Sequence, residues 1–170
     1  MGLDFDAVYA GNFAFVWRNL RRQGVPESQL RDAAQEVFLV VHRRLGDFEG
    51  RAPLRSWLFS IVTRVARQNR RTRRRKELPD VDDPEYVADT TNPDPEGQAE
   101  RGESLRLVLE LLGELDEGKR DVFVLSDLED MTVPEIAAAV NANVNTVYSR
   151  LRAARSELRR ALQRRRVHEP

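Results

Sequence analysis

The sequence predicts an all-α protein made of two small helical domains that are joined by an acidic, flexible linker. Apolar residues recur at three- and four-residue steps along most of the chain, and no segment alternates convincingly as a strand. The charge is segregated, with a net +9 over residues 1–76, −14 over 77–130 and +5 over 131–170. Residues 77–103 hold ten acids, one Arg and four Pro, with too little apolar surface to offset the chain entropy of folding. We therefore expect a domain over 1–76, a linker over 77–103 and a domain over 104–170.

The composition narrows the classes of function. The 28 basic residues balance 28 acidic ones, and all but Lys76 and Lys119 are Arg, the side chain best suited to bidentate phosphate and guanine contacts. Basic modules on either side of an acidic connector indicate an anion-binding protein. The absence of Cys excludes disulfides and thiolate zinc sites and agrees with a reducing cytosol. Because neither a signal peptide nor a bilayer-spanning apolar run is seen, we expect a cytoplasmic protein without membrane insertion.

Two amphipathic helices open the chain. The first stops at Gly24, and Pro26 and Ser28 begin the second. The inward positions are Phe5, Val8, Tyr9, Phe13, Val16 and Leu20 in the first helix, and Leu30, Ala33, Ala34, Val37, Phe38, Val41 and Leu45 in the second. The opposite face of the second helix shows Asp32, Gln35, Glu36 and Leu39. This face is either a docking patch for a basic partner or an ordinary solvated surface.

A breaker-rich loop over 46–53 leads into a third helix. Its inward residues are Trp57, Leu58, Ile61, Val62 and Val65, and its outward residues are Ser60, Thr63, Arg64, Arg67, Arg71 and Arg74. A helix with one apolar side and one Arg-lined side suits phosphate binding. The aromatic residues Phe48, Trp57 and Phe59 near the loop could stack on bases, although Trp57 also lies on the apolar stripe.

Two shorter helices are expected after the linker, before the last pair. Ser104 caps one of them, and Asp116 or Glu117 starts the other. The inward residues are Leu105, Val108, Leu109 and Leu112 in the first, and Val122, Phe123 and Leu125 in the second. These helices would support the pair of helices that follows.

The carboxy-terminal stretch from 132 to 162 has the pattern of a helix-turn-helix. Thr132 and Glu135 can form a capping box around Pro134, Asn141 can end that helix in a left-handed conformation, and Asn143 can cap the next. The inward residues of the second helix are Val144, Val147, Leu151, Ala154, Leu158 and Leu162, and its outer face carries Asn145, Tyr148, Ser149, Arg152, Arg155 and Arg159. Such a face suits base edges and phosphates in a major groove. The alternative is a helical hairpin with a solvated Arg face.

The combined pattern resembles the extracytoplasmic-function (ECF) class of bacterial RNA polymerase sigma factors. Residues 32–38 (DAAQEVF) resemble the polymerase-binding motif of region two, and residues 55–61 (RSWLFSI) resemble the segment that leads the promoter-melting helix. Residues 132–137 (TVPEIA) and 145–155 (NTVYSRLRAAR) resemble region four. Each motif is common alone, but their order around an acidic linker, with no third domain between, is specific.

The resemblance implies two domains, a region 2 helical bundle and a region 4 helix-turn-helix, with three sets of binding residues. Asp32, Gln35, Glu36 and Leu39 would bind the bacterial RNA polymerase core. Gly50, Arg51, Leu54, Trp57, Arg64, Arg67 and Arg71 would bind the minus-ten element of promoter DNA, with the loop receiving a flipped base. Asn145, Thr146, Tyr148, Ser149, Arg150, Arg152 and Arg155 would read the minus-thirty-five element. An anti-sigma factor and a nucleoid-associated location are also implied.

Three hypotheses of function follow. The first is a transcription initiation factor that brings polymerase to a promoter and opens it, with each domain turning its arginine-lined side toward one duplex. The second is a stand-alone helix-turn-helix regulator, which leaves the patch around Glu36 and the loop at Gly50 without a role. The third is an enzyme, but the sequence has neither a phosphate-binding glycine loop nor a nucleophile paired with a base. We therefore expect no catalytic residue, no cofactor and no metal site.

Overall fold

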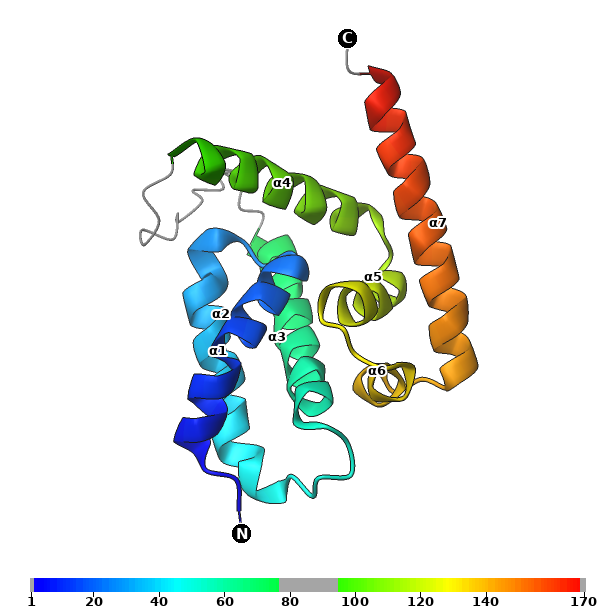
Figure 1. Ribbon diagram of the computed structural model, residues 1–170. Helices are drawn as coiled ribbons and strands as arrows, with labels where there is room; N and C mark the ends of the chain where they lie inside the picture. The colour runs from blue at the N-terminus through cyan, green and yellow to red at the C-terminus, as the bar shows by residue number, and fades with distance from the viewer. Residues whose placement is uncertain (1, 77–94, 169–170) are drawn as a thin grey trace.

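The computed structural model describes residues 2–76 and 95–168, and the chain is helical in nearly all of this part (Figure 1). The elements are α1 (Phe5–Arg22), α2 (Glu27–Arg44), η1 (Leu45–Asp47), α3 (Leu54–Lys76), α4 (Pro95–Glu114), α5 (Glu117–Phe123), η2 (Val124–Leu128), α6 (Val133–Val140) and α7 (Val144–His168). The described residues form no strand, which confirms the all-α prediction.

The predicted signals at helix ends act as expected. Gly24 has a φ of +84°, a conformation that glycine adopts without strain, and α1 ends there. The capping box of α6 is present, with the Thr132 backbone N–H donating to Glu135 Oε2 over 2.7 Å. Asn141 ends that helix with a φ of +50°, and Asn143 Oδ1 accepts from the Thr146 backbone N–H at 2.8 Å. The helix-turn-helix of α6 and α7 is therefore confirmed.

The boundary of the linker needs a correction. Helix α4 begins at Pro95, so residues 95–103, which we assigned to the linker, are helical. A Pro in the first turn gives up an N–H that has no helical partner, and its fixed φ suits a helix start. The remaining linker residues, 77–94, lie outside the described part of the chain.

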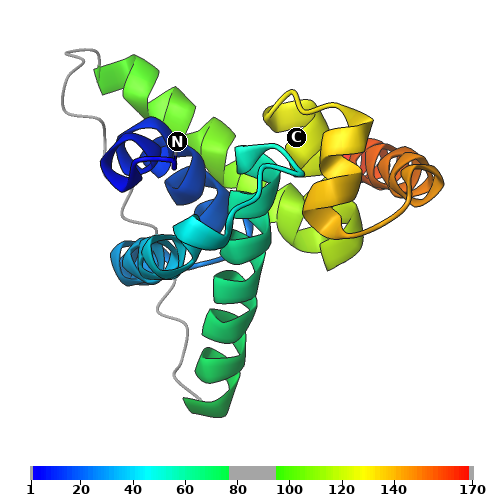
Figure 2. The same ribbon diagram turned by 90° about the horizontal axis from the view of Figure 1, so that it is seen from below.

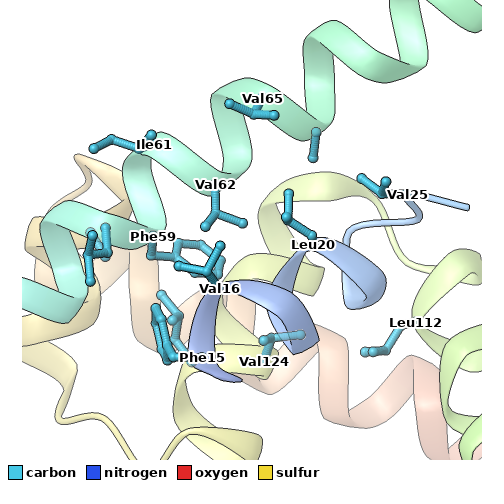
Figure 3. Close-up of a cluster of buried hydrophobic side chains, with 14 of the residues drawn as sticks. Phe15, Val16, Leu20, Val25, Phe59, Ile61, Val62, Val65, Leu112 and Val124 are labelled. Carbon is cyan, nitrogen blue, oxygen red and sulfur yellow. The ribbon is translucent and has the colours of Figure 1, made fainter. Parts of the chain in front are cut away.

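The two helical domains lie directly against each other. Helix α3 packs on α6, and α1 contacts α4 (Figures 1 and 2). Gln23, just after α1, donates a hydrogen bond to Asp121 of α5. Their buried residues form one continuous cluster, in which Phe15 and Phe59 lie near Val124 of the second domain (Figure 3). We expected two bodies that each turn an arginine-lined side outward. In the structure, the two bodies instead pack against each other.

This contact explains which residues of the first domain depart from the predicted core. Phe15 is 1% exposed because the second domain covers its side of α1, whereas Tyr9 is 42% exposed on the outer side. Phe13 is likewise exposed. Phe59 is fully buried, so it cannot serve as a stacking platform, and Thr63 is buried rather than outward. A helix that buries two sides does not follow a single apolar stripe.

The core of the second domain also differs at its margins. Val144 is exposed at the first turn of α7, and Leu162 is exposed near its carboxy-terminal end. Ala161 is buried in place of Leu162. On α4, Leu111 and Leu112 are buried but Val108 is exposed. The other inward residues of α7 are confirmed: Val147, Leu151, Ala154 and Leu158.

Candidate nucleic-acid interface

The outer face of α2 is uncovered. Its inner side is held in the core by Ala33, Ala34, Val37 and Phe38. The residues predicted to bind a partner are all exposed on the other side: Asp32, Gln35, Glu36 and Leu39. Leu39 is 49% exposed, so this face presents one large apolar side chain beside two acids and an amide.

The loop before α3 forms a small hollow. The rings of Phe48 and Trp57 lie 5.1 Å apart, and Gly50 turns the chain with a φ of +68°. The hollow has a volume of about 260 Å³, and its wall includes Ala138 of α6. Next to it, Ser56 Oγ donates to the Glu135 carbonyl oxygen over 2.9 Å. Helix α6 of the second domain therefore forms part of the wall of this hollow.

Arg51 and Leu54, also predicted to bind the minus-ten element, differ in exposure. Arg51 is strongly exposed, and its Nε lies 2.5 Å from Glu49 Oε2. Leu54 is half-buried against the core.

The arginines of α3 face the second domain. Arg64, Arg67 and Arg71 are exposed and line a cleft between α3 and α5 to α7. Arg67 forms an ion pair with Glu117 of α5. Within the described part of the chain, Arg64 and Arg71 have no carboxylate partner.

The residues predicted on α7 divide into two groups. Asn145, Tyr148, Ser149 and Arg152 are exposed and available to a ligand. Three others are engaged or partly covered. Arg155 binds Asp127 with an Nη2–Oδ1 distance of 3.0 Å, Arg150 lines the cleft beside Gly118, and Thr146 is half-buried.

A buried carboxylate joins the two domains, and sequence reasoning missed it. Glu129, at the end of η2, accepts hydrogen bonds from α1: from Arg18 Nε at 2.7 Å, Arg18 Nη2 at 2.6 Å, Arg22 Nη1 at 2.5 Å and Asn19 Nδ2 at 3.1 Å. Its side chain is 1% exposed. Burial favours the neutral form, but the bonds and charges of Arg18 and Arg22 outweigh it, so the pKa of Glu129 lies below its ordinary value.

A second buried carboxylate lies at the same contact. Asp121 of α5 accepts a hydrogen bond of 2.6 Å from Gln23 Nε2 of α1. Burial raises the pKa of Asp121 to about 6, and the Gln23 bond only partly opposes this. The only signal in the sequence was the presence of Asn19 and Gln23 at inward-facing positions near the end of α1, both of which are fully buried.

Two other kinds of site were searched for in the described residues. In residues 2–76 and 95–168, no group of three or more His, Asp or Glu side chains could hold a metal ion. None of the helices in those ranges is long and apolar enough to cross a membrane.

Comparisons with known proteins match both domains. The profile of Sigma-70 region 2 matches residues 8–76, and that of Sigma-70 region 4 matches residues 105–164. The RNA polymerase sigma factor CnrH of Cupriavidus metallidurans is 34% identical over 144 residues, covering 81% of this chain and 75% of that protein. The ECF RNA polymerase sigma-E factor of Escherichia coli K12 is 29% identical over 144 residues, covering 79% and 74%.

Solved structures agree. The structure of CnrH in complex with the cytosolic domain of CnrY has a TM-score of 0.71 and 30% identity, covering 94% of this chain and 87% of that one. The sigma factor RpoE of Bartonella quintana, in complex with the anti-sigma factor NepR, has the same fold, with a TM-score of 0.72 at 21% identity over 94% and 97%.

The chain belongs to the sigma-70 family of RNA polymerase sigma factors and to its ECF class. It is a transcription initiation factor that directs RNA polymerase to specific promoters. The hypothesis of a stand-alone regulator is not favoured, because residues 8–76 match Sigma-70 region 2, which such a regulator would not need.

Proposed function

We propose that the outer face of α2 binds the polymerase core through Asp32, Gln35, Glu36 and Leu39. The observation that carries this proposal is that the contact between the two domains leaves this face exposed. Polymerase can therefore bind the face whether the two domains are in contact or apart. An exposed Leu among acids and an amide can combine apolar contact with attraction to a basic surface.

Replacing Glu36 by Arg should weaken binding to core polymerase about ten-fold or more, because like charges brought together at an interface cost several kcal/mol. Affinity can be measured by titrating labelled core with the purified chain. Asp6→Arg, which makes the same charge change at an exposed position of α1, is the matched control and should bind normally. Unchanged binding by Glu36→Arg would remove α2 from the interface.

We propose further that the loop before α3 and the α3 arginines bind the minus-ten element, and that α7 reads the minus-thirty-five element. The hollow beside Phe48 and Trp57 supports the first assignment, since an unstacked base packs on aromatic groups. The exposed row of Tyr148, Ser149 and Arg152 supports the second.

Arg152→Ala should reduce promoter binding by the polymerase complex at a cost of about 1–3 kcal/mol if the guanidinium contacts a base edge. The measurement is a competition between the promoter and a duplex with a scrambled minus-thirty-five element. Arg166→Ala removes the same charge further along the helix and serves as the control. An equal loss on both duplexes would instead assign Arg152 to a phosphate.

In this proposal the two domains must separate before a promoter is opened. Helix α6 walls the loop hollow, and Ser56 is bonded to the Glu135 carbonyl oxygen. Arg150 lies at the wall of the cleft, and Arg155 is paired with Asp127. A flipped base and the α3 phosphate contacts both need the space that the second domain occupies. The arrangement in which the two domains are in contact, which we call the closed arrangement, is therefore a resting form.

We also propose that an anti-sigma protein binds this chain. We propose further that this chain works in the cytoplasm, at the nucleoid. Support comes from the solved relatives, CnrH with the cytosolic domain of CnrY and RpoE with the anti-sigma factor NepR. Gel filtration with a candidate partner tests the proposal: a stable complex that no longer binds core polymerase is expected.

A further inference from the structure

A large cleft lies between the two domains. It has a volume of about 920 Å³, with α3 on one side and α5, the end of α6 and α7 on the other. The far end of α3 projects beyond the bundle beside it (Figure 2). Five arginines line this cleft: Arg64, Arg67, Arg71, Arg75 and Arg150.

The cleft holds an excess of positive charge. Its carboxylates are Glu117, which is paired with Arg67, and Asp121, which is 4% exposed and bonded to Gln23. Within residues 2–76 and 95–168, the other four arginines form no ion pair, although Arg150 is near enough to Asp116 to interact with its charge. A concave site concentrates the field of such charges, and Phe59 and Val140 form part of its apolar wall.

The position of Arg150 depends on a glycine. A Cβ atom at Gly118 would lie 3.3 Å from Cζ and Nε of the Arg150 side chain. The absence of a side chain at Gly118 thus lets the guanidinium lie close against α5, at the wall of the cleft. Arg150 is the contribution of the second domain, whereas the other arginines all come from α3.

The chemistry favours a small ligand with several phosphate groups. Guanidinium groups bind phosphate oxygens with paired, charge-assisted hydrogen bonds. Several arginines spread around one hollow match a chain of phosphates better than a single one. The volume lies in the range of small-molecule sites, about 300–1,000 Å³, and both domains wall the space.

We propose that this cleft binds a small polyanion carrying two or more phosphate groups, such as a nucleoside polyphosphate, which bridges α3 to Arg150 of α7. Because the site is complete only when the domains are in contact, the ligand stabilises the closed arrangement. The ligand also occupies arginines of α3 that we have assigned to promoter DNA. This competition with DNA rests on the proposed function, whereas the binding site itself does not.

Calorimetric titration of the full chain with inorganic tripolyphosphate at low salt tests the site without polymerase or promoter. We expect saturable binding of one ligand per chain. Arg71→Ala and Arg150→Ala, one from each domain, should each weaken it about ten-fold, the effect of one charge-assisted contact of about 1.4 kcal/mol. The matched controls Arg43→Ala and Arg159→Ala remove the same charge at exposed positions outside the cleft and should change affinity less than two-fold.

Parallel titrations with a nucleoside triphosphate distinguish recognition of the phosphate chain alone from recognition of a nucleotide, which would bind more tightly than tripolyphosphate. Thermal unfolding supplies a second readout, since the ligand should raise the Tm of the wild type but not of Arg150→Ala. Equal losses in cleft variants and controls would show general attraction to a basic surface and overturn the proposal. The absence of saturation would overturn it too. Neither result would affect the promoter assignments.

Discussion

Replacing Glu129 by Ala should open the contact between the domains and lower the free energy of unfolding by about 2–4 kcal/mol. The Glu129 side chain is 1% exposed and accepts four hydrogen bonds from Arg18, Asn19 and Arg22. Its removal would leave the guanidinium of Arg22, whose side chain is 18% exposed, without a counter-charge at the contact. We take the lower part of the range for such pairs because Arg18 is 39% exposed and partly screened by water.

The measurements are urea unfolding and small-angle scattering, in which the variant should show a larger radius of gyration than the wild type. Asp127→Ala is the matched control because it removes an acid from the same segment, but one that pairs with Arg155 inside the second domain. If both variants kept the wild-type radius and stability, Glu129 would not hold the domains together.

The same carboxylate predicts how the contact responds to acid. The folded-state pKa of Glu129 is lowered from 4.5, so its stabilising contribution is present above that value and is lost as the pH falls below it. In Glu129→Ala this component of acid sensitivity should be missing.

Asp121→Asn should have the opposite effect and raise the free energy of unfolding at pH 7 by up to about 3 kcal/mol. Burial raises the pKa of Asp121 from 3.8 to about 6, so the folded chain holds this proton more tightly than the unfolded chain. Stability from this group is therefore full below about pH 4, falls as the pH rises toward 6, and stays low above it. The uncharged Asn side chain of the variant avoids the free-energy cost of burying a carboxylate charge.

The surroundings of Asp121 support this substitution. The groups that face it are Gln23 from α1, Arg67 and Arg70 from α3, and Glu117 and Arg120 from α5. Gln23 Oε1 is buried without a hydrogen-bond partner, and the new amide N–H₂ could donate to it.

The test of this second prediction is denaturant unfolding between pH 4 and pH 8. The slope of stability between pH 4 and 6 should flatten in Asp121→Asn but persist in the control Asp127→Asn, which changes an exposed acid. A variant less stable than the wild type at pH 7 would show that the charged form of Asp121 is the one that the arginines of α3 favour.

The two carboxylates together set how firmly the closed arrangement is held. Glu129 is satisfied by four hydrogen bonds and stabilises the contact, whereas Asp121 has a single hydrogen bond and at neutral pH carries a buried charge that weakens it. A contact that combines a strong pair with an unfavourable one can be stable and still open when polymerase or promoter offers better partners. This suits a factor whose resting and working forms differ.

Sequence alone was sufficient for several helix ends and for the solvent-facing sides of α2 and α7 around Glu36 and Arg152. The capping box at Thr132, the left-handed Asn141 and the stop at Gly24 depend on residues within a few positions of one another, and short-range rules describe them well. The exposed faces around Glu36 and Arg152 likewise follow from helical periodicity within a single helix.

Only the tertiary structure could decide how the two domains meet. Glu129 lies 107 to 111 positions from its partners on α1, and Asp121 lies 98 from Gln23, so no local pattern links them. The burial of Phe15 and the place of Arg150 at the cleft wall also depend on the contact between the two domains. Periodicity identifies the apolar side of each helix, but docking of whole domains determines which remaining side chains become partners and which stay free to bind.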